Sequence, residues 1–169
     1  MTNKTNATTG GLLMVHSTPS ALCPHIEWAA EGILGVPADF VWTPQPVQPG
    51  SYRAELAWSG PEGTGARLAS AFMAWQRVRF EVTEDAPMGG EGNRWSYTPT
   101  LGIFRATTGV HGDILVPEER IRAAIAADAS GEVPIKLALD ELLGTAWDDE
   151  LDAFRAGEDA PVRWLHRAG

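Results

Sequence analysis

The spacing of apolar and polar residues over positions 11–83 predicts six elements in the order strand, helix, strand, strand, helix, strand. The predicted strands carry an apolar residue at every second position or an unbroken apolar run, and the predicted helices carry apolar residues three or four positions apart. This order is typical of the ferredoxin-like βαββαβ arrangement, in which two helices cover one face of an antiparallel sheet. We therefore predict an α+β fold built on this unit.

The first three elements have recognisable boundaries. Residues 11–16 (GLLMVH) are apolar on both faces, as in a central strand. A helix follows the capping residues 17–20 and ends at Gly35, with Pro24 in its first turn, where a proline is tolerated. Residues 40–42 (FVW) run into two prolines, which places this second strand at a sheet edge.

The other three core elements follow the same logic. Apolar and polar residues alternate over 52–58, which predicts the third strand. A glycine-rich loop then leads to a helix whose apolar face spans positions 68–75, with Thr64 as its cap. Alternation over 77–83 predicts the fourth strand.

The second half of the chain extends this core. A glycine-rich turn at 88–93 predicts a hairpin with 94–97, and two further short strands end at Pro117, where helical spacing begins. We divide the chain into a disordered arm (1–10) and a single α+β domain (11–169). The parts of that domain are the ferredoxin-like core (11–83), a hairpin and strand extension (84–116) and an acidic helical extension (117–169).

Composition places the protein in the cytoplasm. The 169 residues are 44% hydrophobic, which is sufficient for one domain with a core, and no stretch resembles a secretory signal or a membrane span. Cys23 is the single cysteine, so the chain forms no internal disulfide, as expected in a reducing compartment.

Charged residues are unevenly distributed along the chain, and their balance argues against some classes of binding partner. The net charge is -9, and residues 84–169 carry 16 acidic and 8 basic side chains. We therefore predict no nucleic-acid and no membrane partner. Charged residues fall on the polar face of the predicted strands, so either the acidic late helices fold over this face, or two copies meet there, or the face is solvated with weak ion pairs. These residues are Arg53, Glu55, Arg77, Arg79, Glu81 and Arg94.

One candidate site lies where the first strand meets the first helix. His16, Cys23, His25 and Glu27 carry imidazole, thiol and carboxylate groups that bind zinc, but their spacing does not match the separated pairs of a structural zinc site. Cys23 and His25 are alternatively a nucleophile and a base, without an identifiable orienting acid. The structural alternative is a buried cysteine with hydrogen-bonded histidines. We predict no cofactor.

Two further sequence features are candidate sites. His111 and Asp113 in a glycine-rich loop are a possible base and carboxylate partner, although a turn held by the aspartate also explains them. The loop Gly63, Thr64 and Gly65, followed by Arg67, is a candidate site for a phosphate or carboxylate. It lacks the Gly-Lys-Ser/Thr ending of a nucleotide-binding loop, so a helix cap and tight turn explain it equally well.

Several longer strings resemble those of one known family: HSTPSALCPHIEWA at His16, WTPQP at Trp42, GTGARLASA at Gly63, RWSYTPTLGIF at Arg94, LLGTAWDDELDAF at Leu142 and PVRWLH at Pro161. The chain resembles an uncharacterised actinobacterial family, a domain of unknown function, over nearly its whole length after residue 10. The resemblance implies a bacterial cytosolic protein and supplies no reaction, ligand or catalytic residue.

Two hypotheses of function follow from the sequence. The first is a non-enzymatic binding or regulatory module that acts on a protein partner or on a second copy of itself, because no complete catalytic set is present. The alternative is a small-molecule or metal-dependent enzyme or sensor, with its site near His16, Cys23, His25 and Glu27.

Overall fold

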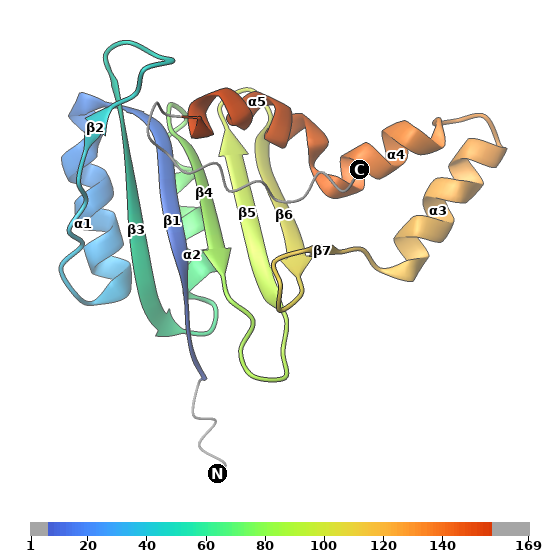
Figure 1. Cartoon of the computed structure of the whole chain (residues 1–169), viewed down its shortest axis with the longest axis horizontal. Coiled ribbons are helices and arrows are strands. Elements are labelled where there is room, and N and C mark those ends of the chain that lie inside the picture. Colours follow the sequence, from blue (N-terminus) through green and yellow to red (C-terminus); the bar gives the residue numbers. More distant parts are fainter. Residues whose placement is uncertain (1–6, 157–169) are drawn as a thin grey trace.

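The computed structural model describes residues 7–156, and this part of the chain forms a mixed α/β fold around one open antiparallel sheet (Figure 1). The sheet has seven strands: β1 (Thr8–Pro19), β2 (Thr43–Pro44), β3 (Ser51–Pro61), β4 (Arg79–Glu84), β5 (Gly92–Thr98), β6 (Gly102–Thr108) and β7 (Ile114–Leu115). The helices are η1 (Ser20–Leu22), α1 (Cys23–Leu34), α2 (Thr64–Phe72), α3 (Glu118–Ala129), α4 (Ile135–Leu143) and α5 (Thr145–Arg155).

The order of the strands is β2-β3-β1-β4-β5-β6-β7, and all neighbours are antiparallel. This order differs from that of a four-stranded ferredoxin-like sheet, because β5, β6 and β7 continue the sheet beyond β4. Each of these strands follows its neighbour through a short connection, which is the simplest way to lengthen an antiparallel sheet. The sequence predicted a hairpin strand at 94–97 and two further short strands, and the fold has β5, β6 and β7 at these places.

The hydrophobic core lies between the sheet and the helices α1 and α2, which Figure 1 shows behind the sheet. Leu13 and Phe80 from the strands and Phe72 from α2 are completely buried in it. Because side chains alternate between the two faces of a strand, the neighbouring residues of β1, β4 and β5 point to the opposite face. Glu81, Arg94 and Thr98 on that face bind α5, so α5 covers the polar side of the sheet.

A β-bulge in β1 changes which side chains reach that polar side. Val15 pairs with Phe80 and Ser17 pairs with Arg79, so His16 is an extra residue without a counterpart in β4. A bulge of this kind bends the strand and turns successive side chains to the same face. Both His16 and Ser17 accordingly meet groups beneath α5, and the alternation read from the sequence ends at this point.

Three local expectations need correction. Residues 8–10 were predicted as part of a disordered arm but belong to β1, where the Thr9 hydroxyl donates to the Asp85 carbonyl; residues 1–6 lie outside the described residues. The second strand is Thr43–Pro44 and not residues 40–42, because the rings of Phe40 and Trp42 stack on each other and pack against the core. Thr64 does not cap α2, since its hydroxyl donates backwards to the Pro61 carbonyl.

Helices α3 and α4 form a hairpin that projects from the β7 end of the sheet, and we call residues 118–143 the α3–α4 arm (Figure 1). The arm buries little of its own surface, because only Ala124 of α3 is buried and α4 has no buried residue. Its turn is held by Asp128, whose carboxylate accepts the backbone N–H of Ile135 at 2.9 Å. The arm is thus a folded but poorly covered element.

Gly144 joins the arm to α5, and two structural constraints favour glycine at this position. Its φ is 69°, a left-handed conformation that other residues adopt at a cost. A Cβ at this position would lie 2.6 Å from the ring of Phe104, which itself packs against Trp147. The close approach lets Trp147 reach the sheet and donate its indole N–H to the Gly102 carbonyl.

The Gly144→Ala variant should therefore unfold at a lower urea concentration than the wild type. We expect a loss of about 2–4 kcal/mol, from positive-φ strain of about 1 kcal/mol and overpacking against Phe104. Gly112→Ala is the matched control. Gly112 has a φ of 83°, but a Cβ added there would meet no other atom within 4 Å. The control should lose only the strain contribution, and equal losses for the two variants would contradict the role of the Phe104 contact.

Candidate functional site

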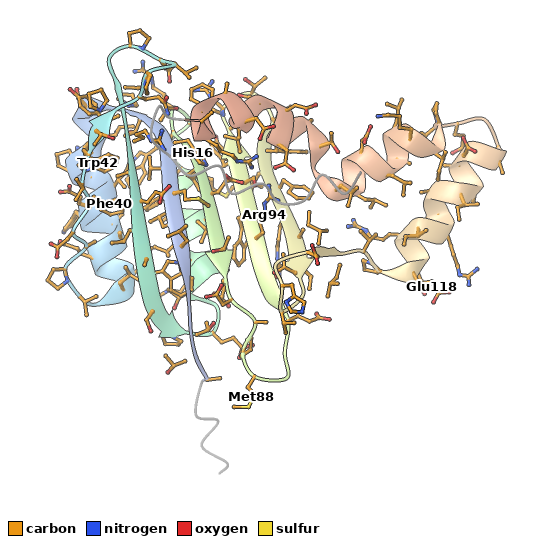
Figure 2. The ribbon with its side chains drawn as sticks, viewed as in Figure 1. His16, Phe40, Trp42, Met88, Arg94 and Glu118 are labelled. Atoms are coloured by element: carbon orange, nitrogen blue, oxygen red, sulfur yellow. The ribbon has the colours of Figure 1, made fainter. Side chains whose placement is uncertain are left out.

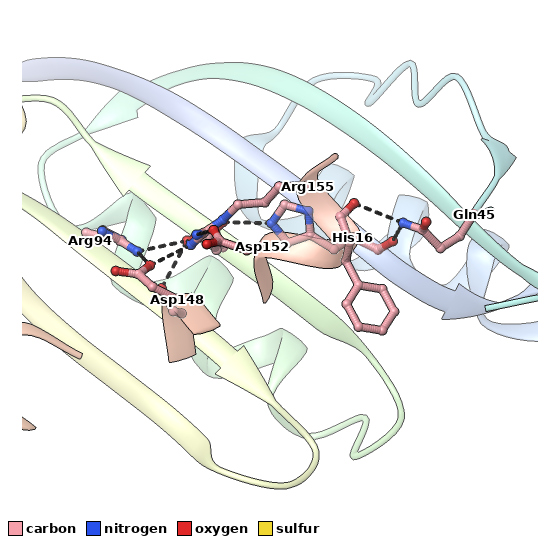
Figure 3. Close-up of polar contacts among 9 residues, drawn as sticks. His16, Gln45, Arg94, Asp148, Asp152 and Arg155 are labelled. Atoms are coloured by element: carbon pink, nitrogen blue, oxygen red, sulfur yellow. Dashed lines mark hydrogen bonds and ion pairs between the residues drawn. The ribbon is translucent and has the colours of Figure 1, made fainter. Parts of the chain in front are cut away.

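The polar face of the sheet holds a buried ionic cluster centred on Glu81, which is 3% exposed. Figure 3 labels His16, Arg94 and Arg155, which all contact Glu81. Its carboxylate accepts two hydrogen bonds from the guanidinium of Arg155, at 2.9 and 2.6 Å. Arg94 and Ser96 donate to it from the neighbouring strand, each at 3.2 Å. Because an ionised carboxylate can only accept, His16 Nε2 is the donor in its 2.7 Å contact with Glu81.

Side chains of α5 complete this Glu81 cluster from above. Asp148 accepts hydrogen bonds from Arg94 and Arg155, and Asp152 accepts from Arg155 at 2.8 Å. A second group of contacts lies beside the cluster, where Glu150 accepts from the Thr98 hydroxyl at 3.0 Å and from Arg79 at 3.4 Å. The acidic C-terminal half therefore does fold over the charged strands, through α5.

Apolar and backbone contacts reinforce the docking of α5. Leu151 is completely buried, and the guanidinium of Arg79 lies 4.5 Å from the centre of the Phe154 ring. The amide of Gln45 donates to the His16 carbonyl at 2.6 Å and to the Phe154 carbonyl at 3.1 Å, so it ties the end of α5 to β1. α5 is consequently an integral part of the fold.

The pKa values in the cluster follow from this arrangement. Burial by itself would raise the pKa of Glu81, but the hydrogen bonds and charges of His16 and Arg155 outweigh it and hold that pKa well below its usual range. Burial would lower the pKa of Arg155, whereas its contacts with Glu81 and Asp148 raise it above the usual value. Both groups stay charged at neutral pH, and each already has its partners.

The fold does not bring the four residues of the first candidate site together. His16 lies beneath α5 on Glu81, whereas the Cys23 thiol points to the Pro19 carbonyl at 3.9 Å and His25 is exposed. Glu27 accepts the indole N–H of Trp42 at 2.6 Å. Burial, together with the charge of Glu27, raises the pKa of the Cys23 thiol, which is opposite to what a thiolate nucleophile needs.

The second candidate pair lies in the turn between β6 and β7. His111 and Asp113 are both exposed there, and the Asp113 backbone carbonyl accepts the N–H of Gly109 at 2.9 Å. Gly112 N–H donates to the Gly109 carbonyl, which closes the turn. The observed hydrogen bonds are thus those of a tight hairpin turn.

At the N-terminus of α2, a carboxylate of the protein itself occupies the place that a bound anion would take. Glu84, from the end of β4, accepts the backbone N–H groups of Gly63 at 2.9 Å and Gly65 at 2.7 Å, and it is 5% exposed. This satisfies the first amides of the helix and favours its dipole. Thr64 is buried and Arg67 is exposed on the same turn.

The α3–α4 arm presents large apolar side chains that the described part of the chain covers only in part. Among them, Leu137 is 58% exposed and Ile125 is 56% exposed. Figure 2 labels Glu118 at the start of the arm, far from His16 and the Glu81 cluster. The other large apolar residues of the arm that remain exposed are Ile121, Val133, Leu139 and Leu143.

A cleft of about 300 Å³ lies at the base of the arm. It opens between the last two strands and the helices, and its walls include Ile114, Leu115 and Leu142. Its two charged lining residues are Arg105 and Arg120. The cleft therefore combines apolar side chains with two basic ones.

A comparison with protein families identifies the chain. A family model described as "Protein of unknown function (DUF3145)" matches residues 12–167. The chain belongs to the DUF3145 family. The comparisons find no matching curated protein and no matching solved structure.

Within residues 7–156, no group of three or more His, Cys, Asp and Glu side chains is placed to hold a metal ion. In the same part of the chain, no helix combines the length and apolarity that crossing a membrane requires. Sequence reasoning identified the helices of the arm but missed their exposure, since the apolar spacing in α3 and α4 is that of an ordinary packed helix.

The Arg155→Met variant should destabilise this DUF3145 protein by about 3 kcal/mol. It removes the guanidinium that donates two hydrogen bonds to the buried carboxylate of Glu81. The free energy of unfolding from urea titration measures this loss. Arg122→Met is the control, since Arg122 forms an exposed pair with Glu118 and should cost less than about 0.5 kcal/mol. Similar losses for both variants would mean that the Glu81 cluster does not hold α5.

The stability of this DUF3145 protein should fall in acid. Because the pKa of Glu81 is lower in the folded chain than its unfolded value of about 4.3, its contribution is complete above that value and is lost as the pH falls below it. Arg155 stays protonated throughout and adds no slope. The urea midpoint of the wild type should drop between pH 6 and pH 3, and that of Glu81→Gln should drop less. If the midpoints of the two proteins fall in parallel, Glu81 is not the group responsible for the loss of stability in acid.

Proposed function

We propose that the protein is a non-enzymatic binding module and that the α3–α4 arm is the element that binds a protein partner. One observation carries this proposal: the arm is folded and projects from the sheet, yet its large apolar side chains remain exposed. Contiguous apolar surface on a soluble domain usually marks an interaction site. The exposed apolar residues of the arm offer such a surface.

The state of the polar residues supports a binding role over catalysis. In the Glu81 cluster, both oxygens of the buried carboxylate accept hydrogen bonds from groups of the same chain. The amides at the start of α2 are likewise taken by Glu84. A catalytic centre needs a base or nucleophile with access to a substrate. Enzyme or sensor chemistry near His16 and Cys23 lacks that support.

Three finer statements belong to this proposal. The order β2-β3-β1-β4, with α1 and α2 on one face, supports a ferredoxin-like unit within the longer sheet. The single cysteine supports a cytoplasmic location. An actinobacterial source remains a prediction from the sequence strings.

Site-specific photocrosslinking in the cells that produce the protein tests the proposal. A photoreactive amino acid at position 125 or 143 should give discrete adducts, because these side chains face the bound partner. Position 110 is the control, since Val110 is 72% exposed in the turn before β7 but lies outside the arm. Adducts at 125 and 143 but not at 110 are expected.

The same experiment can also contradict the proposed role of the arm. If positions 125 and 143 give no adduct, or if all three positions give the same products, the arm is not the binding element. The mass of each adduct also separates a different protein from a second copy of this chain, since the latter has twice the mass of 18.2 kDa.

A further inference from the structure

We infer that the partner segment is a basic amphipathic helix of another protein, an inference that rests on the proposed binding role of the α3–α4 arm. Two independent features of the arm carry it. One is the spacing of the exposed apolar residues, and the other is the sign of the charges that have no partner.

The apolar residues of the arm are spaced for contact with a helix. Ile121 and Ile125 lie four positions apart on α3, and Leu139 and Leu143 lie four positions apart on α4. Residues at this spacing are neighbours on one helix face, roughly 5–6 Å apart, and form a short ridge. An amphipathic helix can lay its apolar face against apolar ridges of this kind.

The charges of the arm and of α5 fall into two classes. Glu118 with Arg122 and Lys136 with Asp140 form pairs along their own helices, so they are already compensated. Five exposed acidic residues form no ion pair within residues 7–156: Glu119, Asp128, Glu132, Glu141 and Asp149.

Among the basic residues of the arm, Arg120 alone forms no ion pair within that same part of the chain. The uncompensated charge of the arm is therefore mainly negative. A partner whose apolar face is bordered by Lys or Arg complements this surface.

Charge also argues against a second copy as the occupant. Two identical arms in contact would bring the same uncompensated carboxylates together, and each chain carries a net charge of -9. Like charges that face each other across an interface are unfavourable, and a large net charge opposes self-association. A basic partner gains from the same charges.

Three labelled 18-residue peptides provide a direct test by fluorescence anisotropy. The first carries Leu at helical spacing with Lys elsewhere, the second has Glu in place of Lys, and the third keeps the Lys composition but scrambles the Leu spacing. The Leu/Lys peptide should bind the full-length protein at least tenfold more tightly than either of the others. Equal binding of the first and third peptides would show simple charge attraction and would overturn the inference.

Variants locate the binding on the arm. Ile125→Asp should weaken binding of the Leu/Lys peptide at least tenfold, because it places a charge in the apolar ridge. Val110→Asp adds the same charge to an exposed side chain outside the arm and should leave the affinity unchanged. Circular dichroism checks that both variants remain folded. Equal affinities of Ile125→Asp and wild type would contradict the arm as the site.

The outcomes separate this inference from the proposed function. Crosslinked adducts with another protein at positions 125 and 143, without preference for the Leu/Lys peptide, would retain the binding role and overturn the basic helix. Adducts made only of two copies of this chain would also overturn it. Loss of the arm adducts altogether would overturn the binding role itself.

Discussion

The buried ion pair between Glu81 and Arg155 is the interaction on which the arrangement of the second half of the chain depends. A carboxylate in the middle of a sheet face is tolerated only when charged donors satisfy it, and Arg155 supplies two of them from the last turn of α5. This requirement fixes α5 across β1, β4 and β5. Since Gly144 joins α5 directly to α4, the position of α5 also sets where the α3–α4 arm leaves the body of the protein.

The two faces of the sheet are stabilised by different types of interaction. The face beneath α1 and α2 is a dense apolar core around Leu13, Phe72 and Phe80, where burial of nonpolar surface dominates. The face beneath α5 is held by charge-assisted hydrogen bonds, which require particular partners and geometry. The apolar face tolerates repacking of similar side chains, whereas the polar face specifies one position for α5. This division explains how a single sheet can position two unlike layers.

The Glu81 cluster and the arm differ in how far their groups are already satisfied within the chain. Buried polar groups in the cluster are satisfied within the chain, and so are the amides at the start of α2, which Glu84 caps. In the arm, by contrast, a hydrogen bond holds the turn, but large apolar side chains remain exposed. Groups that are already paired have little to offer a ligand, while uncovered apolar surface gains free energy when a partner covers it. Glu81 and Glu84 are held by contacts within the chain, and the arm is the element for which we propose binding.

The sequence by itself determined the type and order of the elements in the first half, because periods of 2 and 3.6 residues are local properties of strands and helices. It also determined the excess of negative charge in the second half. Only the tertiary structure decided the contacts between distant residues: the bulge that turns His16 towards Glu81, the stacking of Phe40 and Trp42 that displaces the edge strand to Thr43, and the approach of Glu84 to Gly63 and Gly65. It decided as well that Ile125 and Leu137 remain exposed, since periodicity shows that a helix has an apolar face but not whether another element of the chain covers it.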